Sequence, residues 1–383
     1  MSLVTVSSDD FSRAVQLAKN IVAGRTTIPL YESVLISARD GSMRVAATSA
    51  DHAVETEIPC QGDGAWLLSH ARLSAFVAAI LKGKPVTISG ESIASLRCGS
   101  VSARIGSLTT EDFPAFSEKP AFSASPTWET ASFPAIISRL AMNCDDRPSF
   151  LAARAVHVKI NGTKGRAYGA TGFTLARQDF STDTPCEISL AIDMTTAPVI
   201  SALFEKGPLW IAQTGKTLWM KANGTTYHSK TVDVESPDHI GALEYMPGDT
   251  ITADMDSVTR ALKAVQNVSS SKERPVLFNV TDEGSFIAGK DGAAALCVPF
   301  DTDGNGAVSC LFNADQFRRV LGACSAETIQ FGWRDTLSSG AATGALTFTG
   351  EGFFALAMPL KSNDMEVAEM MAAWRGTPER FAA

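Results

Sequence analysis

The sequence predicts an α+β fold made of three repeated domains, each with two helices and antiparallel sheets. Helix-like segments, strand pairs and glycine turns recur three times in the same order, and the turn glycines Gly41, Gly162 and Gly284 lie 121 and 122 residues apart. Regular recurrence of whole supersecondary units is the sequence signature of an internal repeat. Three unrelated α+β domains would not keep these offsets.

The first helix of each unit is predicted from apolar residues at helical spacing, which place one face of the segment against a core. Ser132 followed by Pro134 is a typical helix start. The three segments are residues 7–24, 132–143 and 253–267. The apolar faces are Phe11, Val15, Ala18 and Val22 in the first segment and Met255, Val258, Leu262 and Val265 in the third.

A second helix is predicted later in each unit, and each begins at a residue that can accept a hydrogen bond from the first turn. These capping residues are Ser69, Asp193 and Asn313. The segments that they open are residues 69–83, 193–207 and 313–326.

Between the two helices, each unit has alternating, β-branched runs typical of strands. The runs are separated by Asp40-Gly41, Asn161-Gly162 and Glu283-Gly284. Hairpin turns need residues that tolerate positive φ, and these dipeptides supply them. The predicted domains are residues 1–124, 125–247 and 248–361, followed by an extension over residues 362–383.

The bulk composition is that of a water-soluble globular protein, with 45% hydrophobic and 19% charged residues. A net charge of −8 argues against a protein that holds nucleic acid by bulk electrostatic attraction, although a small basic surface is compatible with it. Seven scattered cysteines, without a CxxC motif, fit a reducing compartment. With no signal peptide and no long apolar run, we expect a cytoplasmic protein.

Local motifs for catalysis or metal binding are not found. The five histidines show no paired ligand spacing, and neither a phosphate-binding loop nor a GxSxG elbow is present. We therefore expect no cofactor, no metal and no enzymatic activity. A hydrolase whose catalytic residues are scattered along the chain is the third function considered, after the two given below.

The repeated units resemble the bacterial DNA polymerase III β subunit, the β sliding clamp. The resemblance rests on five motifs in order: "GRTTIPLYESVLISARDGSMRVAATSADHAVETEIP" (24–59), "DFP" (112–114), "GATGFTLA" (169–176), "KTVDVESPD" (230–238) and "ALAMPLK" (355–361). The resemblance covers residues 3–361. It implies a β sliding clamp or a divergent paralogue of one. The family implies a head-to-tail homodimer whose ring of six domains has helices around the hole.

The resemblance implies a DNA polymerase processivity factor that encircles double-stranded DNA without sequence specificity. Enclosure needs no strong attraction, so an acidic protein can act in this way if its inner face is basic. Met194-Thr195 replaces the basic residues that the family tends to place at the second helix of the middle domain, so this domain is expected to contribute little. The candidate DNA-binding cations are Arg25, Arg72, Arg147, Lys272 and Arg274.

In the family, polymerase and clamp-loader subunits insert short peptide motifs into an apolar pocket between the second and third domains. Phe173-Thr174 replaces the family's usual His-Arg, which predicts a more apolar wall and a changed preference for partners, or loss of binding. The pocket residues implied by the resemblance are Leu151, Gly172, Phe173, Thr174, Leu175, Pro237, Ala242, Leu356, Met358 and Pro359. Ile105 and Val268 are the implied dimer-interface residues.

The extension is an unusual feature, because family members usually stop just after the strand that ends at Pro359. Asn363 and Glu366 can cap a helix, and Val367, Met370, Met371 and Trp374 form an apolar stripe that must dock to be ordered. One interpretation is that it covers a nearby sheet. The other is that it lies over the peptide pocket and regulates access.

A second function from another class is a clamp-fold scaffold or ligand-binding protein that no longer encircles DNA. The two functions differ in whether the chain dimerises and is retained on circular DNA.

Overall fold

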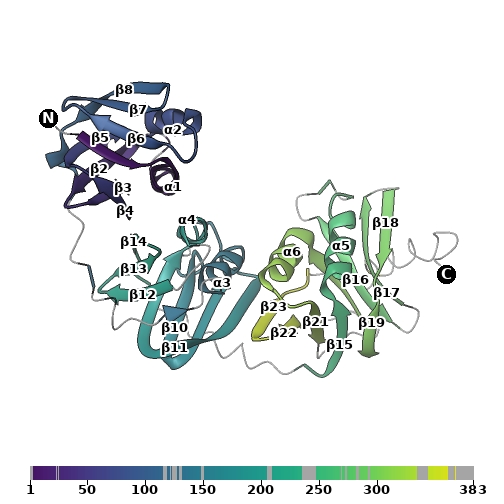
Figure 1. The fold of residues 1–383 in the computed structure, drawn as a ribbon. Helices are drawn as coiled ribbons and strands as arrows, with labels where there is room; N and C mark the ends of the chain where they lie inside the picture. The colour runs from purple at the N-terminus through teal and green to yellow at the C-terminus, as the bar shows by residue number, and fades with distance from the viewer. Residues whose placement is uncertain are drawn as a thin grey trace.

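The computed structural model contains six α-helices within the residues that it describes (Figure 1). Those residues are 3–22, 24, 26–114, 119–120, 122, 127–128, 132–147, 151–204, 209–234, 247–268, 270–271, 274–281, 284–291, 294–333, 344–360 and 367.

The first unit has two helices, α1 and α2, packed against antiparallel strands. Its elements are β1 (Leu3–Ser7), α1 (Ser8–Ala18), β2 (Ser33–Arg39), β3 (Ser42–Thr48), β4 (His52–Gln61), β5 (Gly64–Ser69), α2 (His70–Ala79), β6 (Pro85–Ser89), β7 (Ile93–Cys98) and β8 (Val101–Leu108). Short 3₁₀ turns precede β2 and follow β8, at Pro29–Glu32 and Thr110–Asp112.

The second unit repeats this order with longer strands. Its elements are β9 (Thr127–Trp128), α3 (Ser132–Ala141), β10 (Ala155–Ala170), β11 (Thr174–Asp193), α4 (Thr196–Leu203), β12 (Leu209–Thr214), β13 (Thr217–Ala222) and β14 (Thr225–Lys230). The register between β10 and β11 shifts between Gly162 and Lys164. Gly162 has φ +61°, as the predicted turn residue requires.

The third unit repeats the order again. Its elements are β15 (Asp249–Asp254), α5 (Met255–Val265), β16 (Pro275–Thr281), β17 (Gly284–Asp291), β18 (Ala294–Pro299), β19 (Thr302–Asn305), β20 (Val308–Asn313), α6 (Ala314–Ala323), β21 (Thr328–Trp333), β22 (Leu346–Gly350) and β23 (Phe353–Ala357). The α+β class and the threefold repeat are therefore confirmed.

All six predicted helices are present, and each is shorter than its sequence pattern. Phe11, Val15 and Ala18 are buried on α1, and Val22 lies beyond its end, partly buried against the core. On α5, Met255, Val258, Leu262 and Val265 are all buried, as their spacing predicts.

The caps agree less completely with the prediction. Asn313 accepts hydrogen bonds from the backbone N–H groups of Asp315 and Gln316. Ser69 takes the capping position of α2 without a side-chain bond. Asp193 was the wrong cap for α4: its Oδ1 accepts bonds from the N–H and hydroxyl of Thr195, which is the capping residue. The carboxylate therefore stabilises the turn that leads into the helix rather than the helix itself.

Sheets continue from one unit into the next. β4 of the first unit pairs with β14 of the second within a 12-stranded sheet. β11 of the second unit pairs with β23 of the third within a 7-stranded sheet. The third unit also has a 4-stranded sheet in the order β18-β17-β16-β20. The three units are thus joined by main-chain hydrogen bonds as well as by packing.

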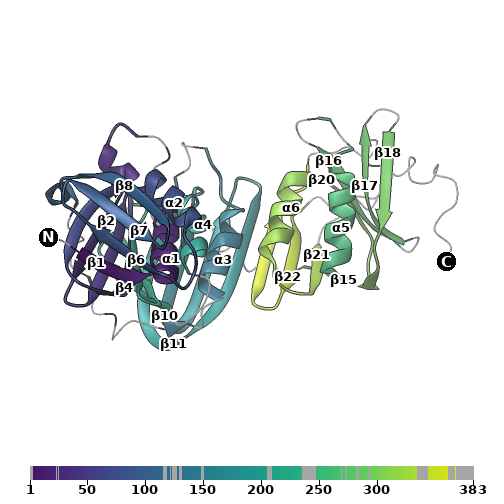
Figure 2. The ribbon, with the colours of Figure 1, turned by 45° about the horizontal axis from the view of Figure 1, so that its top comes forward.

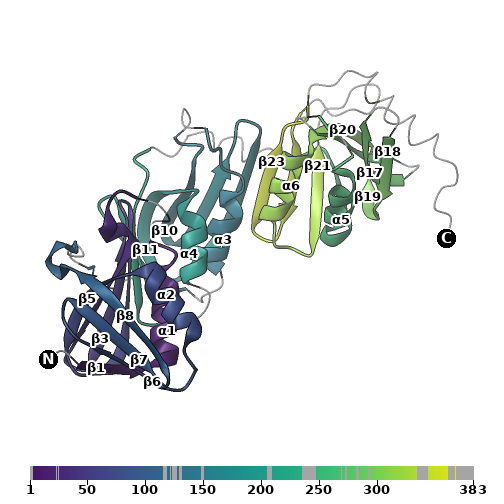
Figure 3. The ribbon, with the colours of Figure 1, turned by 90° about the horizontal axis from the view of Figure 1, so that it is seen from above.

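The three units follow one another in an arc (Figure 3). The helices lie along one side of the arc, and the sheets lie along the other. Figure 2 shows α3 and α6 facing one another where the second and third units meet. There Asn143, which is fully buried just after α3, donates a 3.0 Å hydrogen bond to the carbonyl oxygen of Arg319 on α6. A buried bond of this kind fixes the register of the two helices.

Candidate nucleic-acid interface and partner site

The exposed faces of the six helices carry more positive charge than the rest of the chain. The helices contain seven Lys or Arg and four Asp or Glu, whereas the whole chain contains 33 and 41. The four acidic residues lie in first turns, where they complement the helix dipole. The helical side is therefore net positive on a chain that is net negative.

The third unit supplies most of these cations. On α5 and α6, Arg260, Lys263, Arg318 and Arg319 are exposed, on the sides of the helices opposite their buried residues. These four cations are not among the predicted ones, which lie on the helices and on the turns after them at matched positions of the repeat. The signal was available, since these cations occupy the polar face of the same amphipathic pattern.

Of the five predicted DNA-binding cations, Arg72 is exposed on α2. Arg274 lies at the start of β16 with φ +40°, and its guanidinium is 3.8 Å from the carboxylate of Asp315. Arg25 and Lys272 lie outside the described residues. The two helices of the middle unit carry little charge: α4 has no charged residue, and Arg139 on α3 is partly buried, which lowers its pKa.

The structure places Arg147 beside the predicted peptide pocket. Its Nη2 would lie 3.6 Å from a Cβ atom added at Gly172. Its Nε lies 2.9 Å from both carboxylate oxygens of Asp145. The hydrogen bond from Arg147 holds the pKa of Asp145 below its usual value. Arg147 is thus a cation held by Asp145 next to Gly172.

Seven of the predicted pocket residues lie where β11 begins and β23 ends. Leu175 pairs with Leu356 in the ladder, and the N–H of Met358 donates a 2.9 Å bond to the carbonyl oxygen of Phe173. The hydroxyl of Thr171 accepts bonds from the N–H groups of Phe173 and Thr174, which fixes the turn. We name the cluster of Gly172, Phe173, Thr174, Leu175, Leu356, Met358 and Pro359 the partner site.

The partner site exposes large apolar side chains in an otherwise ordered loop. Phe173 is 54% exposed and Met358 is 45% exposed, while Thr174 is buried. Leu151, on a separate turn, is 54% exposed. Pro237 and Ala242 lie outside the described residues. Adjacent exposed apolar groups on a rigid turn are typical of a surface that binds another molecule.

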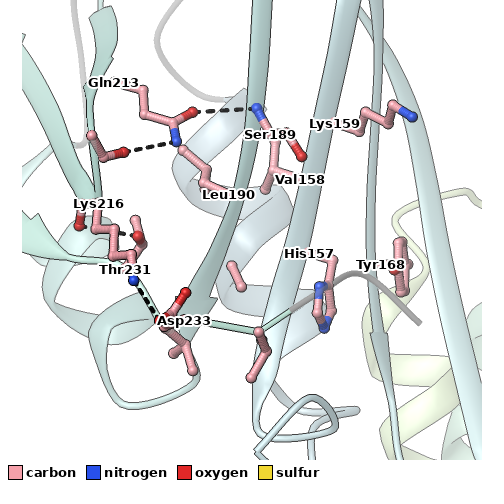
Figure 4. Close-up of a pocket in the computed structure, with 14 residues that line it drawn as sticks. His157, Val158, Lys159, Tyr168, Ser189, Leu190, Gln213, Lys216, Thr231 and Asp233 are labelled. Atoms are coloured by element: carbon pink, nitrogen blue, oxygen red, sulfur yellow. Dashed lines mark hydrogen bonds and ion pairs between the residues drawn. The ribbon is translucent and has the colours of Figure 1, made fainter.

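A separate cavity of about 270 Å³ lies on the second unit (Figure 4). It is lined by residues of β10 and β11, by the turn between β12 and β13, and by residues 231–234. His157 stacks on Tyr168 with ring centroids 5.0 Å apart, and its Nε2 lies 2.7 Å from the carbonyl oxygen of Ala152. Burial lowers the pKa of His157. Lys216 forms an ion pair with Asp233 across the cavity mouth. His157 and the Lys216–Asp233 pair thus each have a partner within this part of the second unit.

Among the described residues, no group of three or more His, Cys, Asp or Glu side chains could hold a metal ion. Within the same residues, no helix is both long and apolar enough to cross a membrane.

The arrangement defines a class of protein: a three-unit clamp fold with a cationic helical side and a sheet side. Residues 2–117 match the family model for the N-terminal domain of the DNA polymerase III beta subunit. The whole chain is similar in structure to clamps that are under 25% identical to it, so that the match beyond residue 117 rests on the fold. The resemblance to the bacterial β sliding clamp is confirmed, at a distance consistent with a divergent paralogue.

Three solved structures illustrate the likeness, and each is matched over 100% of its length by 94% of this chain. The beta subunit of the DNA polymerase of Streptococcus pyogenes has a TM-score of 0.85 at 14% identity. The sliding clamp of Bacillus subtilis has a TM-score of 0.84 at 15% identity. A DnaN sliding clamp from Bartonella birtlesii has a TM-score of 0.82 at 18% identity.

Proposed function

We propose that this chain is a sliding clamp: two copies close head to tail around duplex DNA and tether polymerase and clamp-loader subunits through short peptides. It acts as a non-enzymatic processivity factor in the cytoplasm and needs no cofactor. The domain boundaries of this proposal are residues 1–124, 125–247 and 248–361. The observation that carries it is the way in which the strands join consecutive units.

The two joints between units inside the chain use equivalent strands of the repeat, paired in the same register. Thr225, the first residue of β14, pairs with Thr56, and Phe353, the first residue of β23, pairs with Gln178. β14 and β23 are the final strands of their units, and each follows a two-residue turn. The receiving strand is β4 in the first unit, the third strand after α1, and β11 in the second unit, the second strand after α3. The two are equivalent, because β10 runs on through the turn residue Gly162 and takes the place of two strands. One rule therefore generates both joints.

Among the described strands, β8 and β18 each have an open edge at the position that this rule would join. β8 is the final strand of the first unit, and its pairing with β5 is confined to Ser107 and Leu108. β18 is the edge of the 4-stranded sheet. Exposed strand edges recruit other chains unless they are covered. Since β8 and β18 belong to opposite ends of one chain, joining them requires a second copy, and two such joints close a ring.

The rule also predicts the register of the new joint. Thr56 pairs with Val45 in the first unit, and the matching pair in the third unit is Val298 with Ile287. Val101 of the partner subunit should therefore face Val298, and Ser102 of the partner subunit should face Cys297. Leu108 is 45% exposed and Leu296 is 39% exposed, so the joint has apolar area to bury.

The predicted interface residues fit this joint unequally. Ile105 lies on β8 but is 2% exposed, so its side chain belongs to the core and would contribute through its backbone. Val268 is partly exposed and would lie 3.4 Å from a Cβ atom at Gly289 on β17, the neighbour of β18.

The cationic helix faces support the DNA part of the proposal. In a closed ring, the helical side of the arc surrounds the hole, and exposed Arg and Lys side chains there would contact phosphates. Phosphate contacts carry no sequence information, so binding would be independent of sequence. The partner site supports peptide binding, with Phe173 and Met358 as apolar anchors and Arg147 as a cation at its edge.

A single substitution tests the ring. Because Cys297 is native, Ser102→Cys should produce a disulfide-linked species of about twice 40.5 kDa under mild oxidation. The Ser102→Cys, Cys297→Ser double variant is the matched control and should remain at the monomer mass on a non-reducing gel. Failure of the single variant to cross-link, in a chain that is monomeric by light scattering, would refute the ring.

Oxidation of the Ser102→Cys variant after it has been loaded on nicked circular DNA then tests DNA enclosure. The cross-linked ring should remain on the circle in high salt and leave after the DNA is linearised. A ring that never becomes trapped on circular DNA would favour the alternative, a clamp-fold scaffold or ligand-binding protein.

A further inference from the structure

The third unit has an apolar cluster on the face of its 4-stranded sheet that points away from the main core. Its buried members are Leu277, Phe286, Ala288 and Leu311, which we name the outer cluster. Phe286 is 1% exposed and Leu277 is 0% exposed. A sheet face that is this well buried must be covered by something.

The occupant is part of this chain. Val367 is 3% exposed and packs in the same cluster, together with partly buried Leu360 and Cys297. The approach is fixed by a backbone bond of 2.7 Å from the N–H of Leu360 to the carbonyl oxygen of Leu311 on β20. Val367 belongs to the extension predicted from the sequence, and it is the first residue of the predicted apolar stripe.

The extension is about as long as the part of this chain that the solved clamps do not match. The solved clamps align over their full length with 94% of this chain, which leaves about 23 of 383 residues unmatched. Residues 361–383 make a segment of that size.

The position of Val367 separates the two interpretations of the extension. The outer cluster lies on the sheet that ends in edge strand β18, and Cys297 connects the cluster to that strand. Phe173 and Met358 in the partner site remain about half exposed. We infer that Val367 anchors the C-terminal extension on the outer cluster and so braces β18, the edge strand that receives the second copy.

The physical reason for a brace is that an edge strand has one hydrogen-bonded neighbour. β18 pairs with β17 on one side, and four of its six residues are exposed, so packing on its outward side chains holds it in place. A strand already held in its paired conformation loses less entropy when the second copy binds. The inference rests on the proposed ring for its effect on dimerisation, but the docking itself does not.

Val367→Asp in the full-length chain tests the brace, with Val367→Ile as the matched apolar control. Peptide-resolved maleimide labelling of Cys297 reports docking when parent and variants are compared below the dimer dissociation constant, because the proposed joint then does not cover Cys297. The Asp variant should label Cys297 at least tenfold faster than the parent, and the dimer dissociation constant measured by sedimentation should rise about tenfold. The Ile variant should match the parent in both.

Four outcomes would overturn the inference or a part of it. Unchanged Cys297 labelling in Val367→Asp would refute docking through Val367. Faster labelling with an unchanged dimer dissociation constant would refute the brace. Tighter binding of a clamp-binding peptide in the Asp variant would show that the extension gates the partner site instead. A parent chain that is monomeric would refute the ring while the labelling still decides the docking.

Discussion

The cations on α5 and α6 give a prediction for DNA binding whose size follows from the structure. Arg260 and Lys263 are exposed on the polar face of α5. In a ring of two copies, Arg260→Gln with Lys263→Gln removes four cations from the hole. If half of them contact phosphates, the slope of log K against log salt concentration should fall by about 1.8, at roughly 0.9 per contact.

Because of that smaller slope, the loss of affinity between 50 and 200 mM salt should be about twelvefold smaller in the variant than in the parent. The assay is fluorescence anisotropy of the dimer on a short labelled duplex over a salt series. The control, Lys159→Gln with Lys164→Gln, changes the net charge equally but alters exposed lysines on β10. An equal change of slope in both variants would show that net charge alone matters and would refute a helical DNA interface.

Three further predictions concern the partner site and the first joint. Phe173→Asp should weaken a clamp-binding peptide at least tenfold by fluorescence polarisation without altering the dimer mass; unaltered affinity would exclude this loop as the pocket. Glu55 is 2% exposed and forms an ion pair with Arg44, so Glu55→Gln should lower the free energy of unfolding by about 1–3 kcal/mol in urea; no loss would show that the pair is screened. Burial lowers the pKa of His228, which stacks on Trp219, from 6.5 to about 4. Because protonation then favours the unfolded chain, stability should be complete above pH 6.5 and fall toward pH 4, by at most about 3 kcal/mol and less after solvent screening. His228→Gln should flatten this dependence, and an unchanged pH profile would contradict it.

The arrangement of helices could be predicted from the sequence because it depends on local spacing. The buried faces of α1 and α5 follow directly from residues such as Phe11 and Leu262. Asn313 caps α6 because its side chain reaches the N–H groups two and three residues later. The cap of α4 was misplaced because two candidates two residues apart, Asp193 and Thr195, compete for the same turn.

The candidate sites were less predictable because they depend on pairs of distant residues. The sequence indicated that Arg147 belonged with other basic turns, whereas its neighbour Gly172 lies 25 residues away along the chain. Ile105 was chosen from its place in the family pattern, and its burial could not be known before β8 was placed in its sheet.

The sequence by itself determined the repeat, the class of fold and the stripe on the extension, since each is a periodic pattern in one segment. The tertiary structure alone decided which edges remain unpaired and where the extension docks. Strand edges and sheet faces are properties of assembled sheets: β8, β18 and the outer cluster exist only after segments separated by up to about 200 residues have paired. Long-range pairing leaves no local periodicity, so only the folded chain shows it.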